Sequence, residues 1–278
     1  MFYFHCQCRC YDSKMNCLLL RSVPEGATSD KYQEAFDAAG VGCVSLSPIA
    51  FEFTNLPALF SHISRPEDFS GLVFSSPRTV ESVSLCLKHS SAQEAWNREL
   101  KEKWRQLPAF SVGTSTGSGV RSLGLEPVGE DSGNAENLVK IIISAVKPGS
   151  KPLLYPCGTM RRETIPKTLE KEGIDFTADV VYQTVANPGL GDQLMRCIKE
   201  KGAPDCIVFF SPSGVQYSKE VLEGHKDELS NTKFLAIGAT TQTAMEEKGY
   251  LVAGVADKPN PQALLQAIQQ CLQEGRDQ

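Results

Sequence analysis

Short apolar runs alternate along the chain with longer segments in which apolar residues recur every three or four positions. The runs have the length of buried strands, and the recurring pattern is that of helices with one buried face. Alternation of this kind is typical of parallel sheets with helices on both faces. Strands are predicted near residues 16–20, 41–46, 72–75, 108–112, 125–128, 151–155, 174–185, 205–210, 233–237 and 251–255, and helices at 30–39, 134–146, 159–172, 190–201, 212–222, 239–248 and 261–273.

Two segments depart from this pattern. Residues 48–53 alternate in polarity with little turn signal, which predicts an extended connector. Residues 92–104 are charged and have few apolar positions, so we expect a solvated helix or an insertion there.

The chain contains an internal repeat. Ile207-Val-Phe-Phe-Ser-Pro-Ser-Gly-Val215 matches Leu72-Val-Phe-Ser-Ser-Pro-Arg-Thr-Val80. Each copy is a strand cut off by Ser-Pro, where Pro suits the first helical turn and Ser76 or Ser211 is placed to cap the helix. Two further matches follow in the same order: Val112-Gly-Thr-Ser-Thr116 with Ile237-Gly-Ala-Thr-Thr241, and Gly133-Asn-Ala-Glu-Asn-Leu138 with Pro259-Asn-Pro-Gln-Ala-Leu264. The sequence therefore indicates a tandem duplication of an α/β unit.

Length and charge limit the classes of protein. A chain of 278 residues with 41% hydrophobic residues can fill one or two domains, and the duplication favours two. The net charge of −5 argues against a general nucleic-acid or anionic-membrane surface. No apolar run approaches the ~20 residues needed to span a bilayer. Sequence alone leaves open whether the two domains are consecutive or one is inserted in the other.

The cysteines indicate free thiols in a reducing, cytosolic compartment rather than a disulfide framework. Residues 1–14 contain a Cys-x-Cys-x-Cys run without zinc-type spacing, so we predict a disordered leader and no metal. Four cysteines fall on apolar helix or strand patterns, where a buried thiol is expected: Cys86, Cys197, Cys206 and Cys271.

Candidate chemistry lies where the predicted strands end. Ligands of open α/β sheets bind beyond the carboxyl ends of the strands, where each Ser-Pro or Gly-x-[Ser/Thr]-Thr turn offers backbone N–H groups, a helix dipole and a hydroxyl. Such turns suit a carboxylate or phosphate. The four hydroxyl residues of these turns either line a cleft or only cap helices: Ser76, Thr116, Ser211 and Thr241.

Other chemistry has little support. The chain has no Gly-x-Gly-x-x-Gly, no P-loop and no Cys-x-x-Cys pair. Tyr182, in a segment expected to cross between the two halves, can donate a proton without carrying charge, or can simply pack in a strand. Arg78 follows a Ser-Pro turn and is the arginine best placed for an anion, whereas Arg161 and Arg162 fit a solvated helix start better.

Several blocks resemble the uroporphyrinogen-III synthase family in its animal form, over about residues 15–272. The blocks that carry the resemblance are Pro48–Phe53, Arg65-Pro-Glu-Asp68, Phe74-Ser-Ser-Pro-Arg78, Leu153-Leu-Tyr-Pro-Cys-Gly158, Arg162-Glu163, Val181-Tyr-Gln-Thr-Val185, Phe209-Phe-Ser-Pro-Ser-Gly214 and Ala236-Ile-Gly238.

The resemblance implies the fold. Members have two parallel-sheet α/β domains, one inserted in the other, joined by a two-stranded β linker, with a cleft between domains that open and close. Applied to this chain, it implies a leader at 1–14, a first domain at 15–47 plus 185–278, linker strands at 48–53 and 178–184, and an inserted domain at 54–177.

The resemblance also implies the reaction and the site. The substrate is hydroxymethylbilane, a linear tetrapyrrole with eight carboxylates, which loses water and closes with inversion of its last ring through a spiro intermediate, without a cofactor or metal. Tyr182 is expected to act on the departing hydroxyl. The carboxylates are expected to be held by Ser76, Arg78, Thr116, Ser211, Ser213 and Thr241.

The resemblance further suggests a cytosolic monomer that touches hydroxymethylbilane synthase transiently, with no nucleic-acid or membrane partner. Two other readings remain. A two-domain binding protein for an anion or tetrapyrrole would bind without turnover, and would not need Tyr182 at its hinge. A nucleotide-sugar transferase would need paired acidic metal ligands, which the sequence does not show.

Overall fold

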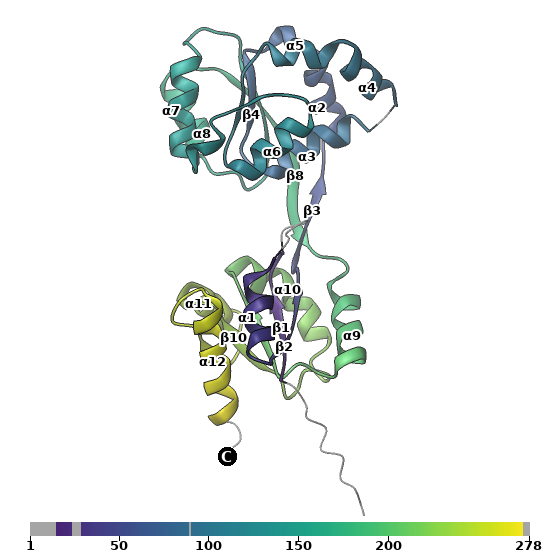
Figure 1. The fold of residues 1–278 in the computed structure, drawn as a ribbon, viewed down its shortest axis with the longest axis vertical. Coiled ribbons are helices and arrows are strands. Elements are labelled where there is room, and N and C mark those ends of the chain that lie inside the picture. The colour runs from purple at the N-terminus through teal and green to yellow at the C-terminus, as the bar shows by residue number, and fades with distance from the viewer. Residues whose placement is uncertain (1–14, 24–28, 89, 275–278) are drawn as a thin grey trace, which may run out of the picture. The chain divides into compact units, whose positions relative to one another are not determined.

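The computed structural model describes residues 15–23, 29–88 and 90–274, which form two compact units (Figure 1). The first unit contains the described residues up to Ala50 and those from Val185 onward, and the second contains Phe51–Thr184. The predicted leader at 1–14, with its cysteine run, lies outside the described residues.

The first unit has a five-stranded parallel sheet in the order β11–β10–β9–β1–β2. Leu18 of the central strand pairs with Val44 on one side and with Ile207 on the other. All four residues of β9 are fully buried, as their continuous apolar run predicts. The strands are β1 (Asn16–Leu20), β2 (Gly42–Leu46), β9 (Cys206–Phe209), β10 (Lys233–Ala236) and β11 (Val252–Val255).

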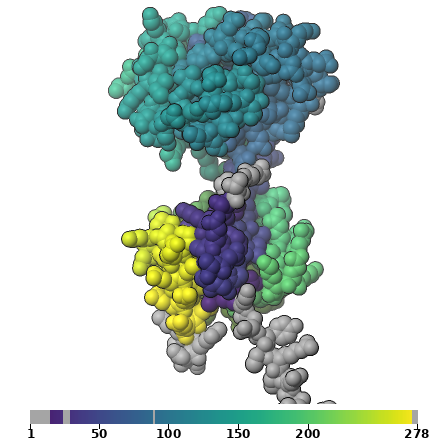
Figure 2. Space-filling model, in the orientation of Figure 1, coloured from purple at the N-terminus to yellow at the C-terminus, as the bar shows by residue number. Residues whose placement is uncertain are grey.

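Helices cover both faces of this sheet. Helices α1 (Lys31–Ala38) and α12 (Pro261–Glu274) lie side by side over one face, purple and yellow in Figure 2, and the Tyr32 hydroxyl donates to the Pro259 carbonyl at 3.2 Å. The Asp30 carboxylate caps α1 by accepting from the Tyr32 N–H at 3.0 Å. The other face carries α9 (Leu190–Lys201), α10 (Pro212–Gly224) and α11 (Ala239–Glu247).

The second unit has a six-stranded sheet in the order β3–β8–β7–β4–β5–β6. The five strands from β8 to β6 run parallel. Strand β3 runs against β8, because the Thr54 N–H donates to the Val181 carbonyl and the Asn187 N–H to the Pro48 carbonyl. The strands are β3 (Ile49–Phe53), β4 (Gly71–Phe74), β5 (Ala109–Ser111), β6 (Pro127–Val128), β7 (Leu153–Gly158) and β8 (Phe176–Ala186).

Both faces of the second sheet are also covered. Helices α7 (Ala135–Ala145) and α8 (Thr164–Lys171) bury one face. The opposite face carries α2 (Leu56–Ile63), α3 (Pro77–Cys86), α4 (Ser90–Ala95), the π-helix η2 (Trp96–Leu100), α5 (Lys101–Arg105) and α6 (Thr114–Ser122), and the 3-10 turns are η1 (Pro66–Asp68) and η3 (Glu130–Ser132).

The fold class predicted from the sequence is confirmed: two α/β units with parallel sheets. The predicted burial of the cysteines is also confirmed for Cys86, Cys206 and Cys271, whereas Cys197 is half-buried, and none of the four forms a disulfide. No helix in the described part of the chain is long and apolar enough to cross a membrane.

The prediction of a solvated segment at 92–104 is wrong. Trp96, Leu100 and Trp104 are at most 4% exposed and belong to the core of the second unit. The Trp104 indole N–H donates to the Ile63 carbonyl at 2.8 Å, and its ring stacks on Phe69. Most of the charged residues between them are exposed. The charged composition of the segment as a whole therefore does not reveal the row of buried residues along one side of it.

The helix predicted to begin at Thr159 begins at Thr164 instead. Strand β7 continues through Pro156 to Gly158, and from Tyr155 onward its register partners lie on β8 alone, since β4 pairs only with Leu153 and Leu154. Proline is tolerated where its missing N–H is not needed by a neighbour. Because β7 is longer than predicted, the β7–α8 turn lies at residues 159–163.

The two sheets share one plan. In the first unit, β2–β1–β9–β10–β11 has the spatial order 2-1-3-4-5. In the second unit, β8–β7–β4–β5–β6 is the same arrangement circularly permuted, because β7 and β8, which take the places of strands 1 and 2, come last in the chain. In this order the chain reverses direction across the sheet between strands 1 and 3, and ligands bind beyond the carboxyl ends at that switch point. The switch points are β1/β9 in the first unit and β4/β7 in the second.

We predict that Trp104→Ala lowers the free energy of unfolding by about 3–5 kcal/mol, because it leaves a large cavity and an unpaired Ile63 carbonyl. Urea denaturation followed by circular dichroism measures the change. Arg105→Ala, at a neighbouring side chain that is 55% exposed, is the matched control and should shift stability by less than about 0.5 kcal/mol. Equal denaturation midpoints for the two variants would contradict the burial of this segment.

Candidate functional site

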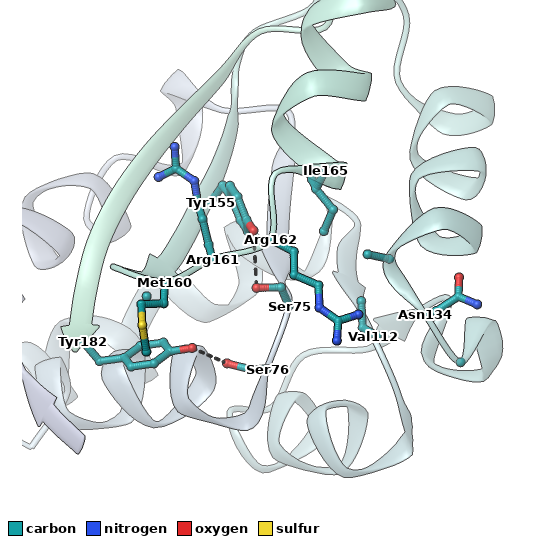
Figure 3. Close-up of a pocket in the computed structure, with 13 residues that line it drawn as sticks. Ser75, Ser76, Val112, Asn134, Tyr155, Met160, Arg161, Arg162, Ile165 and Tyr182 are labelled. Carbon is teal, nitrogen blue, oxygen red and sulfur yellow. Dashed lines mark hydrogen bonds between the residues drawn. The ribbon is translucent and has the colours of Figure 1, made fainter. Parts of the chain in front are cut away.

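A cavity of about 290 Å³ lies at the β4/β7 switch point of the second unit (Figure 3). Ser75 and Ser76 reach it from the end of β4, Tyr155 and Gly158 from β7, and Tyr182 from β8. Arg161 and Arg162 reach it from the β7–α8 turn. The cavity is thus placed where parallel-sheet topology predicts a ligand site.

Tyr182 extends along one wall of the cavity. Its hydroxyl lies 3.3 Å from the Ser76 Oγ, and either atom can be the donor (Figure 3). The Tyr182 ring rests on Gly158, where a Cβ would come within 2.6 Å of the ring carbon that bears the hydroxyl. A residue without a side chain at 158 is therefore a condition for this position of the phenol.

The remaining contacts fix the rest of Tyr182. The Thr159 N–H donates to its carbonyl at 3.1 Å, which ties the β7–α8 turn to β8. The Phe51 ring meets it edge-on with centroids 5.9 Å apart, and Phe53 lies at 6.5 Å. The backbone hydrogen bond, the contact with Gly158 and the aromatic neighbours together fix the ring so that the hydroxyl points toward Ser76.

A second phenol lies deeper in the cavity. Tyr155 is 1% exposed, and its hydroxyl donates to the Ser75 Oγ at 3.5 Å (Figure 3). Burial raises the pKa of Tyr155 above its ordinary value, so this phenol keeps its proton at neutral pH. It serves as a fixed neutral donor rather than as a base.

Two guanidinium groups give the cavity positive charge. The Arg161 Nη1 donates to the Cys157 Sγ at 3.3 Å, and its Nε lies 3.5 Å from the Glu163 Oε1. Burial raises the pKa of the Cys157 thiol, so the sulfur accepts as a neutral group, and the charge of Arg161 is paired only with the Glu163 carboxylate, whose side chain is 53% exposed. Arg162 forms no ion pair with any residue that the structure describes. Arg162 is therefore available to an anion, whereas Arg161 would share its charge between an anion and Glu163.

The amino end of α7 closes the opposite side of the cavity. Gly133, Asn134 and Ala135 line it, and the Asn134 Oδ1 accepts from the Asn137 N–H at 2.9 Å. The first N–H groups of a helix lack helical partners and carry partial positive charge. With the two arginines, they make an environment that favours carboxylate or phosphate. Over the described residues, no group of three or more His, Cys, Asp or Glu side chains is arranged to hold a metal ion.

Of the residues predicted for the second unit, the structure brings Ser76 and Tyr182 together in the cavity. The prediction that Ser76 caps α3 is wrong, since its side chain makes no capping hydrogen bond and meets Tyr182 instead. Arg78 pairs with Glu81 at 2.7 Å and lies over the Phe51 ring, outside the cavity lining. Thr116 is 2% exposed within α6, so its hydroxyl does not line the cavity.

The residues predicted for the first unit lie at the ends of β9 and β10. Ser211 caps α10 as predicted, accepting from the Gly214 N–H at 3.0 Å, and Ser213 Oγ lies 3.0 Å from the Ser211 Oγ. Thr241 is 4% exposed inside α11, which begins after Gly238. What the Gly238 turn offers a ligand is backbone N–H groups rather than the threonine hydroxyl.

Sequence reasoning missed part of the cavity. Arg161 and Arg162, for which a solvated face is the preferred prediction, both line the cavity, where Arg161 is half-buried and Arg162 is exposed. Ser75, Tyr155 and Asn134 were not singled out. A signal did exist for Asn134, because its repeat partner Asn260 also caps a helix, accepting from the Ala263 N–H at 2.9 Å.

The family profile described as "Uroporphyrinogen-III synthase HemD" matches residues 30–266, which is most of the chain. The chain belongs to the uroporphyrinogen-III synthase family. Among the relatives, a protein of Saccharomyces cerevisiae named uroporphyrinogen-III synthase is 27% identical over 92% of this chain and 96% of its own length. A protein of the same name from Chlorobaculum parvum is 26% identical over 88% of this chain and 97% of its own length.

A solved structure agrees at the level of the fold. The crystal structure of uroporphyrinogen-III synthetase from Helicobacter pylori matches with a TM-score of 0.55 and 19% identity, over 92% of this chain and 99% of that one. The family of cyclising lyases in tetrapyrrole biosynthesis thus has the two-unit parallel α/β architecture described above.

We predict that Gly158→Ala displaces the Tyr182 ring and breaks its hydrogen bond to Ser76, because the new Cβ would clash with three atoms of the phenol. Crystal structures of the variant and of the wild type give the ring position directly. Gly224→Ala is the matched control, since a Cβ there meets nothing within 4 Å. An unmoved phenol in Gly158→Ala would mean that the glycine does not set the ring position.

Proposed function

We propose that this member of the family closes hydroxymethylbilane to uroporphyrinogen III, with loss of water and inversion of the last pyrrole ring. The observation that supports this activity most directly is the cavity at the β4/β7 switch point, which combines a phenol, two arginines and a helix amino end. A linear tetrapyrrole with many carboxylates and a hydroxyl leaving group needs all three. The proposed reaction needs no cofactor.

Tyr182 is the proposed partner of the departing hydroxyl. A phenol can donate a hydrogen bond or a proton while remaining neutral, which suits a leaving group in an anion-binding site. The Ser76 hydroxyl can accept from the phenol or donate to it, so it orients the Tyr182 hydroxyl in either role. Whether Tyr182 transfers its proton or only holds the oxygen, its effect depends on this fixed geometry.

Carboxylates of the substrate are proposed to bind the positive side of the cavity. Arg162 and Arg161 offer charge-assisted hydrogen bonds, and the α7 amino end offers backbone N–H groups. In the first unit, the Ser211–Ser213 pair and the turn after Gly238 are proposed to take further carboxylates. The Thr241 N–H donates to the Gly238 carbonyl at 3.1 Å, so Thr241 is proposed to hold this turn in place. Positioning of the chain for inversion is then the main contribution of the protein.

Arg78 and Thr116 do not line the cavity, so each is proposed to reach the substrate in a less direct way. Arg78 can reach a carboxylate only by giving up its ion pair with Glu81, which is an exposed pair of small energetic cost. Thr116 can contribute through the α6 amino end, because its hydroxyl is buried.

The surroundings proposed for the enzyme follow from its substrate and its thiols. Hydroxymethylbilane closes unaided to the type I isomer, so a transient contact with hydroxymethylbilane synthase would protect it in transit. Free thiols at the seven described cysteines suit the reducing cytosol. A monomer is the proposed state of the enzyme.

The activity is tested by incubating purified protein with fresh hydroxymethylbilane, oxidising the products and separating type I from type III uroporphyrin by chromatography. Predominantly type III product is expected. Type I alone, formed at the uncatalysed rate, would contradict the proposed activity and favour the alternative of a tetrapyrrole-binding protein without turnover.

We predict that Tyr182→Phe lowers kcat roughly 100-fold without abolishing the formation of type III product, because it removes the hydroxyl and leaves the binding groups in place. Tyr250→Phe is the matched control. It removes a buried hydroxyl that has no partner among the described residues, and should leave kcat within about twofold. A Tyr182→Phe enzyme with the activity of the wild type would remove this hydroxyl from the mechanism.

A further inference from the structure

One exposed apolar side chain stands at the mouth of the cavity. Three large hydrophobic side chains are exposed among the described residues, namely Val23, Met160 and Leu251. Met160 is 67% exposed and lines the cavity, whereas the other two do not. A single exposed apolar side chain is ordinary on a protein surface. Met160 differs because it lines a cavity together with Arg161 and Arg162, where a bound ligand would cover it.

The position of Met160 is tied to that of Tyr182. Met160 lies in the β7–α8 turn, directly after Thr159, whose N–H donates to the Tyr182 carbonyl. On the other side of Thr159, Gly158 touches the Tyr182 ring. Met160 and Tyr182 both line the cavity (Figure 3), so the turn and β8 each bring an apolar surface to it.

The opposite side is polar. Arg162 and the amino end of α7 face the cavity there, and the buried phenol of Tyr155 donates to Ser75 below. A ligand that fills this space needs a flat apolar body against Met160 and Tyr182, with anionic groups at its edge. A methionine suits the flat body, because its polarizable sulfur packs favourably on aromatic rings and its chain adapts to their tilt.

We propose that Met160 is a substrate-contact residue that packs against one pyrrole ring while Arg162 holds a carboxylate of the same ring. The proposal rests on the proposed function and adds to it a binding group for the ring itself. A ring held on two sides, by the thioether and by the carboxylate, cannot rotate freely about its bridge to the next ring. Met160 thereby contributes to the choice between closure with inversion and closure without it.

The test compares Met160→Ser with Met160→Leu in the full-length protein. Met160→Ser should raise the KM for hydroxymethylbilane roughly fivefold or more, and should raise the share of type I product, because the apolar contact is lost. Met160→Leu keeps an apolar side chain of similar volume and should stay within about twofold of the wild type. The share of type I product is compared at enzyme amounts adjusted to equal rates of substrate consumption, which removes the contribution of slower turnover.

Leu251→Ser is the matched control, because Leu251 is 87% exposed and belongs to the first unit. It should change neither KM nor the product ratio. Thermal unfolding of all three variants should match the wild type, since both positions are largely exposed. Wild-type KM and product ratio in Met160→Ser would overturn the assignment of Met160 while leaving the proposed function intact.

A second readout separates the two hypotheses. If the wild type forms no type III product, the proposed function fails. The contact of Met160 with a pyrrole ring is then tested by measuring the binding of uroporphyrin III through the quenching of tryptophan fluorescence. Binding to Met160→Ser that is weaker than to the wild type and to Met160→Leu would support the ring contact. Equal binding by all three proteins would overturn it.

Discussion

Parallel pairing of β4 with β7 is the constraint on which the cavity of the second unit depends. The pairing covers only Gly71–Leu72 with Leu153–Leu154. Beyond these residues, β4 pairs only with β5 and β7 only with β8. The helix that follows β4 packs on one face of the sheet, and the helix that follows β7 packs on the other. The space left between their starting points is the cavity, and its lining is set by the residues that happen to end each strand.

The two units share their strand arrangement because of the duplication, and they differ at the cavity because equivalent residues have taken different roles. Ser211 and Ser76 occupy equivalent positions, and both precede a proline at the start of a helix. Ser211 keeps the capping role, whereas Ser76 gives it up and meets the Tyr182 phenol. A residue whose local role is replaced by a contact more than 100 positions away in sequence is a mark of a functional site rather than of a turn.

The regular part of the fold was accessible from the sequence because its signals are local. The helices predicted at 190–201 and 261–273 lie within one residue of α9 and α12, and strand 16–20 coincides with β1. Apolar periodicity and capping residues determine these elements at short range.

The missed features depend on long-range contacts. Trp96 and Trp104 are buried by partners such as Leu123 and Ile63, which no local pattern identifies. Arg161 belongs to the cavity because β7 extends three residues beyond the predicted strand end and carries the following turn with it. The sequence singled out Tyr182 but left open whether it packs in a strand or donates a proton, and only the family resemblance favoured the second role. Its support by Gly158 is a contact between two strands that becomes visible only in three dimensions.

The sheet order of the first unit has a consequence for synthesis on the ribosome. Strand β1 lies between β2 and β9, so the sheet cannot form until β9 has emerged, roughly 190 residues after β1. At translation rates of about 5–20 residues per second, β1 and β2 wait roughly ten to forty seconds with an unpaired edge. The second unit, Phe51–Thr184, is contiguous and can complete its strands β4 to β8 during that wait. The nascent chain therefore leaves β1 without its β9 neighbour, and open to chaperones, for longer than any other strand in the described part of the chain waits for its neighbour.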